Sequence, residues 1–147
     1  MSVSLETVME EWKKDSVIDE SRLSMELVRT PSLHSKYLEY FMFFRTKLAL
    51  SEKKYNRMMG IKRRYFRGEL TKDELLKYGW PQWQGLKPNG AEFGILLDAD
   101  DDMNNLLEVV QANKIGVNVL EHIIKQIAGR DWSIKSLIEI QKFHAGM

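Results

Sequence analysis

The chain has no cysteine, only three prolines and no apolar run as long as a membrane helix. The absence of cysteine excludes disulfide bonds, thiolate metal ligands and a cysteine nucleophile, and it fits a reducing cytosol. A membrane span needs roughly 20 mostly apolar residues, so none is expected. The first residues are amphipathic and acidic, which argues against a secretory signal. The length of 147 residues predicts a single domain.

Signals of catalysis and of metal binding are also missing. The three histidines stand far apart without a ligand-like pattern, and no glycine-rich phosphate loop occurs. The acidic run at residues 98–102 does not match a calcium loop, because Met103 stands where such a loop requires glycine. Acids that favour a helix N-terminus are the more ordinary interpretation. We therefore predict a protein that is not an enzyme and that binds no cofactor or metal.

Apolar spacing and capping signals predict helices along most of the chain. A short helix is expected over residues 5–14, and Asp19 is the expected N-cap of a second helix. Thr30 and Pro31 form a further start signal, because proline suits the first helical position. From Pro31 to about Arg67, apolar residues recur at helical spacing, which predicts one long helix with a buried stripe. The stripe consists of Tyr37, Phe41, Phe44, Leu48, Tyr55, Met59 and Phe66.

The middle of the chain is predicted to be mostly loop. Thr71 is the expected cap of a short helical turn, with Glu74 completing a capping box. Residues 78–94 combine two prolines with several glycines and tryptophans, which is typical of a loop. The expected organisation is a single helical domain. It has N-terminal helices over residues 1–68, a loop region over 69–95 and a C-terminal oligomerisation region over 96–147.

The C-terminal region is predicted to form two helices. Over residues 98–128 apolar side chains repeat in a heptad pattern that contains one polar member, Asn113. Gly129 is expected to stop this helix, and Asp131 to cap a last helix over residues 132–144. The last helix has a wide apolar face, which favours contact with a partner.

Positive charge is concentrated in residues 45–67. This segment holds nine basic residues and one acid, Glu52, so it carries +8, whereas the whole chain carries +1. Subtracting +8 from +1 leaves −7 for all other residues. A polyanion is therefore attracted to this segment and repelled elsewhere. Tyr55, Tyr65 and Phe66 lie among the cations. This mixture is typical of surfaces that bind single-stranded nucleic acid, because phosphates need charge and unstacked bases need a flat partner.

Other interpretations of the basic segment stay open. Its charged face could simply be solvated, or it could bind a membrane surface, although other helices offer a partner for its aromatic side. An acidic protein partner would make the chain an adaptor or scaffold. A helix over residues 31–67 would measure about 55 Å, so we expect part of it to contact another subunit. A homo-oligomeric ring would bring several basic faces together.

Several short segments, taken in order, resemble one protein family. They are Glu11-Trp12-Lys13-Lys14-Asp15, Ile18-Asp19 with Leu23, Leu33-His34-Ser35-Lys36-Tyr37-Leu38, Gly94-Ile95-Leu96-Leu97-Asp98, and Ile134-Lys135 with Ile138, Phe143 and Ala145-Gly146. Together they resemble the UvsY family of recombination mediators from T-even-like bacteriophages. The likeness covers most of the chain and is weakest over residues 70–92.

The resemblance implies an all-α, ring-forming protein without enzymatic activity, working in the host cell cytoplasm. Such mediators bind single-stranded DNA, contact the phage recombinase and the phage single-strand-binding protein, and help load the recombinase onto covered DNA. The implied assembly is a homo-oligomer, a hexamer or heptamer, held together by the C-terminal helix. Its expected interface residues are Ile134, Leu137, Ile138 and Phe143.

The resemblance also implies a set of DNA-binding residues. The family's Leu-Lys-Ala-Arg motif falls on Met59-Gly60-Ile61-Lys62, so Lys62 keeps the arginine's charge, whereas Gly60 loses the lysine. Neighbouring arginines are expected to compensate. Tyr65 is the expected stacking partner for a base, because Phe66 belongs to the buried stripe. The predicted DNA-binding residues are Lys53, Lys54, Arg57, Lys62, Arg63, Arg64, Tyr65 and Arg67.

Overall fold

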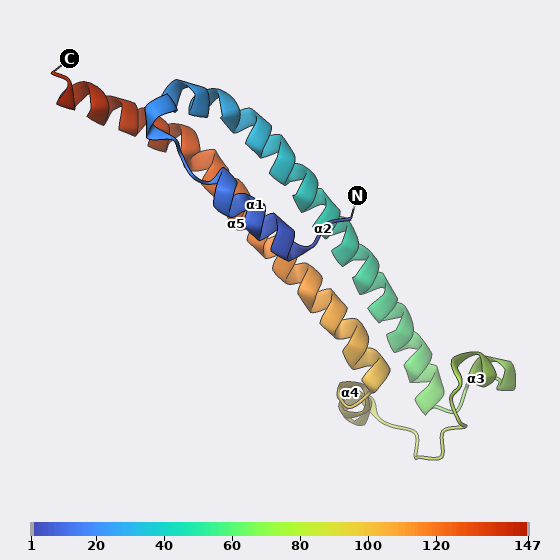
Figure 1. The fold of residues 1–147 in the computed structure, drawn as a ribbon. Coiled ribbons are helices and arrows are strands. Elements are labelled where there is room, and N and C mark those ends of the chain that lie inside the picture. Colours follow the sequence, from blue (N-terminus) through green and yellow to red (C-terminus); the bar gives the residue numbers. More distant parts are fainter. Residues whose placement is uncertain (1, 147) are drawn as a thin grey trace. The chain divides into compact units, whose positions relative to one another are not determined.

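The computed structural model describes residues 2–146, and this part of the chain contains helices and connections but no strand (Figure 1). The predicted all-α class is confirmed. In chain order the elements are α1 (Leu5–Asp15), a 3₁₀ turn (Glu20–Arg22), α2 (Leu23–Phe66), α3 (Lys72–Tyr78), α4 (Gly90–Asp98) and α5 (Asp101–His144). None of these helices is long and apolar enough to cross a membrane.

The chain forms two compact units, and each contains part of α2 and part of α5. Unit 1 consists of Met1–Lys47 and Lys114–Met147, and unit 2 of Leu48–Asn113. The predicted division at residues 68 and 95 follows the loop rather than these units, and it stays a prediction. Because the two long helices belong to both units, each unit is described separately below.

Unit 1 is built around Tyr37, which is completely buried. The ring of Tyr37 contacts Trp12 of α1 edge-on, with 5.3 Å between the ring centroids. α1 begins at the predicted place, where the Ser4 hydroxyl accepts a hydrogen bond from the Thr7 N–H. The other fully or nearly buried apolar side chains of this unit are Val8, Leu23, Leu33, Phe44, Val117, Leu120, Ile123, Ile127 and Ile134.

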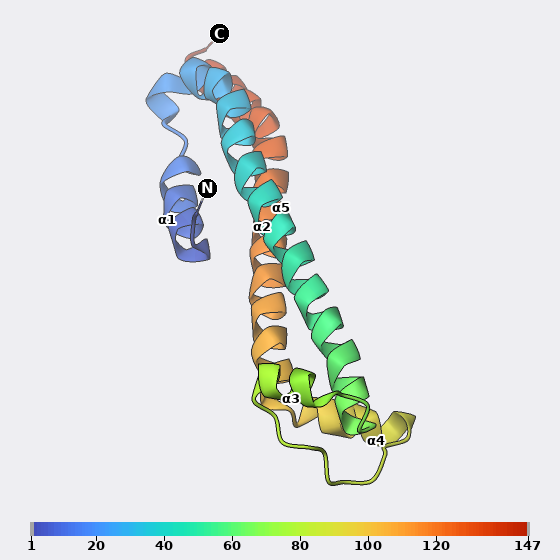
Figure 2. The same cartoon turned by 90° about the vertical axis from the view of Figure 1, so that its right-hand side faces the viewer.

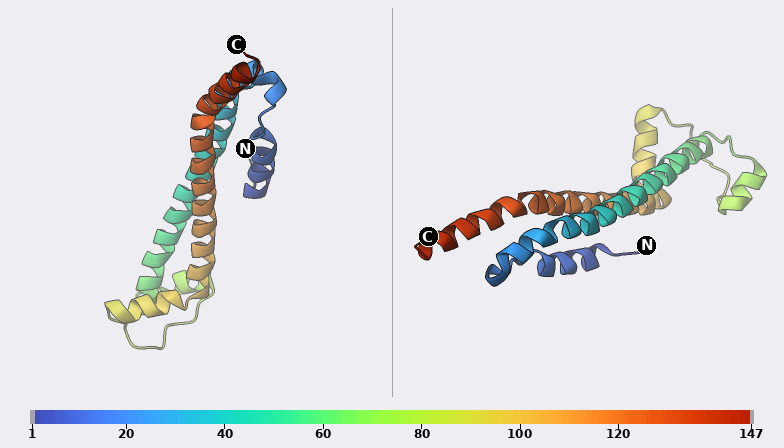
Figure 3. Two further views of the ribbon diagram at one scale, coloured as in Figure 1. Left: turned by 90° about the vertical axis from the view of Figure 1, so that its left-hand side faces the viewer. Right: turned by 90° about the horizontal axis from the view of Figure 1, so that it is seen from above.

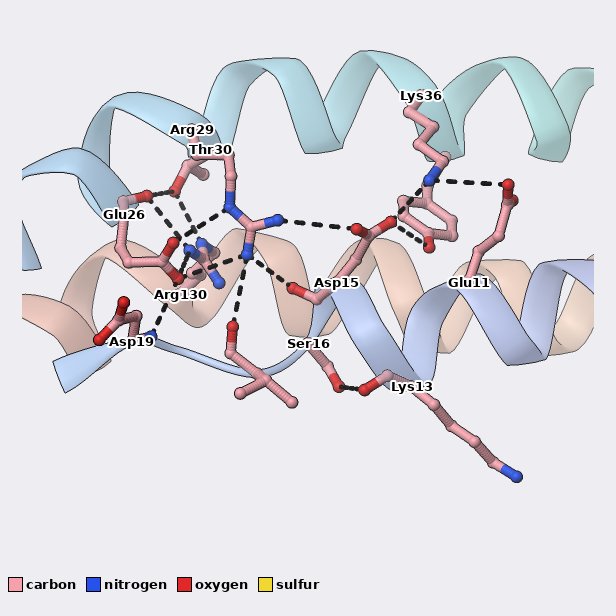
Figure 4. A network of polar contacts seen from close by, with 12 residues as sticks. Glu11, Lys13, Asp15, Ser16, Asp19, Glu26, Arg29, Thr30, Lys36 and Arg130 are labelled. Carbon is pink, nitrogen blue, oxygen red and sulfur yellow. Dashed lines mark hydrogen bonds and ion pairs between the residues drawn. The ribbon is translucent and has the colours of Figure 1, made fainter. Parts of the chain in front are cut away.

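A buried arginine organises the polar part of unit 1 (Figure 4). Arg130 is 5% exposed, and its Nη2 lies 2.7 Å from Glu26 Oε2. Arg29 contacts the same carboxylate and donates to the Asp15 carbonyl. Burial alone would raise the pKa of the Glu26 carboxyl, but hydrogen bonds from Arg130 and Arg29 lower it below its ordinary value. The Asp15 carboxylate likewise forms an ion pair with Lys36, with 2.7 Å between Asp15 Oδ2 and Lys36 Nζ.

The prediction that a helix starts at Thr30 and Pro31 is wrong, because Pro31 lies inside α2. Asp19 does cap the preceding 3₁₀ turn, as expected, by accepting from the Ser21 N–H. Proline lacks an N–H and usually bends or ends a helix. Here Arg130 also donates to the Glu26 carbonyl at 3.2 Å, one turn before Thr30. This contact fixes the turn before Pro31 to Arg130, although the carbonyl that Pro31 leaves without a helical donor is that of Leu27.

The predicted stop at Gly129 is also wrong, because α5 continues from Asp101 to His144. Residues on both sides of Gly129 are fixed in the core: Ile127 is 1% exposed and Ile134 is completely buried. Their packing exceeds the cost of about 1 kcal/mol that glycine brings to a helix interior. The heptad pattern is confirmed, since most of its members are buried. These are Met103, Val110, Asn113, Val117, Leu120 and Ile127.

Unit 2 contains α3 and α4, which lie near the C-terminal end of α2 (Figure 2). The predicted capping box of Thr71 and Glu74 starts α3. Residues 90–98 were expected to be mostly loop, but they form α4, which is started by a second capping box between Asn89 and Glu92. The connection between α3 and α4 has no helix (Figure 3).

Candidate nucleic-acid interface

The basic residues of α2 in unit 2 are mostly exposed, as a nucleic-acid surface requires. The exposed ones are Lys53, Lys54, Arg57, Arg63, Arg64 and Arg67, and together we call them the basic face. Among the described residues, only Arg64 of this set forms an ion pair. The other five cations are therefore available to an external anion. Their positions from Lys53 to Arg67 cover about 21 Å of helix.

Lys62 lies outside the basic face, and its role as a DNA contact stays a prediction. It is 4% exposed, and its Nζ lies 2.9 Å from both Asp100 Oδ1 and Asp102 Oδ2. The same ammonium group lies 3.9 Å from the centroid of the Trp80 ring. The cause is helical spacing, because position 62 is one turn from Phe66 on the buried stripe.

The acids that hold Lys62 belong to the start of α5. Asp100 Oδ2 also accepts a hydrogen bond from the Met103 N–H at 2.9 Å, so Asp100 acts as the cap of this helix. Asp101 and Asp102 lie in its first turn. The interpretation of this acidic run as helix-favouring residues is confirmed. Within residues 2–146 no group of three His, Asp or Glu side chains is placed to hold a metal ion.

Arg64 is exposed, but its charge is already balanced by Glu74 of α3. Both guanidinium nitrogens Nη1 and Nη2 donate to the Glu74 carboxylate at 2.8 Å. The hydrogen bond from Arg64 is the main reason that the pKa of Glu74 falls to about 2. The carboxylate therefore stays charged at any ordinary pH. Glu74 would compete with a phosphate for Arg64.

Tyr65 has partners within unit 2. Its hydroxyl donates to the Pro81 carbonyl at 2.7 Å, and its ring centroid lies 5.1 Å from Trp80 and 6.0 Å from Trp83. These contacts attach the connection between α3 and α4 to the end of α2. The stacking of Tyr65 on a base stays a prediction.

The two tryptophans of the connection are half-buried and pack against other side chains of unit 2. Trp80 stacks on Tyr78, with 4.6 Å between centroids, and Lys62 covers it as well. Trp83 packs edge-on against Phe66 at 4.8 Å. Gly85 lies so close to Trp83 that a Cβ atom at position 85 would be 2.4 Å from Cζ2 of its ring. Any larger residue at position 85 would therefore require the Trp83 ring to shift.

A hollow of about 400 Å³ lies beside the last turn of α2. It is lined by Arg63, Arg67, Pro88, Asn89, Gly90 and Phe93. The guanidinium carbon of Arg63 lies 4.9 Å from the centroid of the Phe93 ring. Sequence analysis missed this hollow because it placed the residues from Pro88 to Phe93 in a loop. The capping pair Asn89 and Glu92 was the available signal for the helix that forms its wall.

The predicted oligomerisation residues lie on α5 in unit 1, and they differ in exposure. Ile134 is completely buried within the protomer, which leaves none of its surface exposed to another copy, and its assignment to an interface stays a prediction. Leu137 and Ile138 are half-buried, and Phe143 is 79% exposed. Trp132, which was not predicted, is 75% exposed. Of the four expected residues only Phe143 is strongly exposed, and Trp132 and Ile140 add to the exposed apolar surface of this end.

Comparisons with known proteins agree with one another. A family model described as "Recombination, repair and ssDNA binding protein UvsY" matches residues 11–147. A crystal structure of the bacteriophage T4 recombination mediator protein UvsY aligns with a TM-score of 0.84 and 23% identity, covering 98% of this chain and 99% of that one. A second crystal form gives a TM-score of 0.83 at 23% identity, covering 96% and 99% respectively. The comparison with curated proteins found no match.

Proposed function

Because this chain belongs to the UvsY family of recombination, repair and single-stranded DNA binding proteins, we propose that it is a recombination mediator whose basic face holds single-stranded DNA. The observation that carries the proposal is the set of five exposed cations, on α2 and directly after its end, without an acidic partner among the described residues: Lys53, Lys54, Arg57, Arg63 and Arg67. Cations on one surface neutralise successive phosphates of a strand without reading its sequence.

The finer role follows from the family. The protein promotes loading of a phage recombinase onto DNA that is covered by a single-strand-binding protein, and it works in the host cell cytoplasm. It acts as a ring of six or seven copies, so that several basic faces contact one strand. Each face binds weakly, but linked faces bind tightly because the second contact is made at high effective concentration.

Salt-dependent binding of a labelled oligothymidylate, followed by fluorescence anisotropy, tests the proposal. For single strands, log K falls against log salt with a slope of about −0.7 per neutralised phosphate. The triple variant Lys53→Ala, Lys54→Ala, Arg57→Ala removes three cations, so we expect the slope to become shallower by about 2 for each bound subunit. Affinity at low salt should fall at least about tenfold. Helix content should persist, because alanine is the best helix former.

Two results would count against the proposal. Unchanged affinity of the triple variant would mean that the strand lies on another surface. Failure of the unaltered protein to bind oligonucleotide in dilute salt would favour the adaptor with an acidic protein partner. Binding should also vary little between oligonucleotides of different sequence, because the basic face offers charge and not base-specific hydrogen bonds.

A further inference from the structure

The hollow beside Arg63 and Arg67 differs from the rest of the basic face. Lys53, Lys54 and Arg57 lie on an open helix surface, where they offer charge alone. The hollow adds walls to the charge, and its volume of about 400 Å³ exceeds what a phosphate group needs. Volumes of about 300–1,000 Å³ are typical of pockets for small organic ligands.

The charges in the hollow favour a phosphate. Arg63 lies in the last turn of α2 and Arg67 follows directly after its last residue, Phe66, and both arginines line the hollow. Neither forms an ion pair within the described part of the chain. Each guanidinium group presents a planar fork of N–H donors, which suits two oxygens of one phosphate. An anion between the two groups also relieves their mutual repulsion.

The walls of the hollow favour a base beside that phosphate. Phe93 and Pro88 supply apolar and aromatic surface. The Phe93 ring also supports the Arg63 guanidinium group, 4.9 Å from its centroid, which limits the freedom of that side chain before any ligand arrives. Glu92 is the acid nearest in sequence to this wall, and its carboxylate accepts the Asn89 N–H in the capping box.

We propose that this hollow holds one nucleotide of a bound single strand, with its phosphate between Arg63 and Arg67 and its base against Phe93 and Pro88. The inference rests on the proposed function, since it assigns a nucleotide subsite on the same basic helix. The remaining cations of the basic face then follow the strand through charge, whereas this position also contacts a base.

Charge-conserving variants separate the subsite from simple electrostatic attraction. Arg63→Lys with Arg67→Lys keeps both charges but loses the planar forks, so affinity for oligothymidylate should fall at least about fivefold while the salt slope stays constant. Lys53→Arg with Lys54→Arg is the matched control, and it should change affinity less than about twofold. Circular dichroism confirms that each variant keeps its helix content.

The base contact is tested with Phe93→Leu, which keeps an apolar side chain but removes the ring. Its affinity for oligothymidylate should fall about threefold or more, whereas its affinity for an abasic strand of equal length should equal that of the unaltered protein. If both subsite variants bind oligothymidylate within twofold of the unaltered protein, the subsite is refuted and the proposed function stands. If the unaltered protein binds no strand at low salt, the proposed function itself fails, and the subsite with it.

Discussion

Lys53 and Lys62 are the same residue type on the same helix, yet the structure gives them opposite surroundings. Lys53 is exposed on the basic face, whereas Lys62 is buried between Asp100, Asp102 and the Trp80 ring. The spacing of four residues between Lys62 and Phe66 was visible in the sequence, and it indicates that Lys62 is buried. The pairing with Asp100 was not visible, because it joins residues that are distant in the chain.

Substituting each lysine by methionine should therefore produce different defects. Lys62→Met leaves Asp100 and Asp102 without their cation, so we expect a loss of about 1–2 kcal/mol in the free energy of unfolding. Affinity for single-stranded DNA should stay within about twofold. Lys53→Met should weaken DNA binding and leave stability nearly unchanged, because the side chain is exposed. Chemical denaturation and fluorescence anisotropy measure the two effects. A folded Lys62→Met protein that binds DNA as weakly as Lys53→Met would restore Lys62 to the DNA-binding set.

At the level of elements, local signals predicted where apolar faces lie better than where helices end. Most of the heptad pattern on α5 is buried, whereas the stripe on α2 is buried at Tyr37, Phe44 and Phe66 and half-buried at its other members. Pro31 and Gly129, however, are ordinary helix breakers that tertiary packing overrides. The long-range contact between Arg130 and Glu26 fixes the turn before Pro31, and nothing in the local sequence reveals it.

The glycines of α5 provide a matched pair for testing this packing. At Gly129 an added Cβ meets no atom within 4 Å, whereas at Gly116 it would lie 2.4 Å from the buried Phe44 ring. Gly129→Ala should therefore stabilise the protein by up to about 1 kcal/mol through helix propensity. Gly116→Ala should destabilise it by about 1–3 kcal/mol through crowding. Thermal unfolding followed by circular dichroism at 222 nm measures the change in Tm for both variants. Equal shifts in the same direction would contradict the difference in packing.

At the scale of the whole molecule, the sequence alone shows that positive charge is concentrated in residues 45–67, and this concentration predicted the basic face. The hollow at α4 was not readable, because it depends on how the helix from Gly90 to Asp98 meets Arg63 and Arg67. Ile134 illustrates the same limit: its apolar character predicted burial, but not whether its neighbours are in the same chain or in another. The structure places those neighbours within unit 1.

The proposed assembly can be tested at the exposed end of α5. Phe143 is 79% exposed, so Phe143→Glu should leave the protomer folded and place a charge in any interface that covers the ring. We expect a smaller species in analytical ultracentrifugation. Leu86→Glu is the matched control, because Leu86 is 92% exposed but lies in the connection between α3 and α4. The mass of the Leu86→Glu assembly should equal that of the unaltered protein. An unaltered mass for Phe143→Glu would exclude this residue from the contact between copies.

The buried pair Asn113 and Ser51 has a consequence for how α2 and α5 align within unit 2. Asn113 Nδ2 donates to Ser51 Oγ at 3.1 Å, and Ser51 Oγ donates to the Leu48 carbonyl. A repeating apolar pattern fits its neighbour almost equally well after a slip of one heptad. Such a slip would leave both polar side chains buried without a hydrogen-bond partner, which would cost about 1–3 kcal/mol of stability for each. One amide thus selects a single alignment for two helices that could otherwise slide past each other.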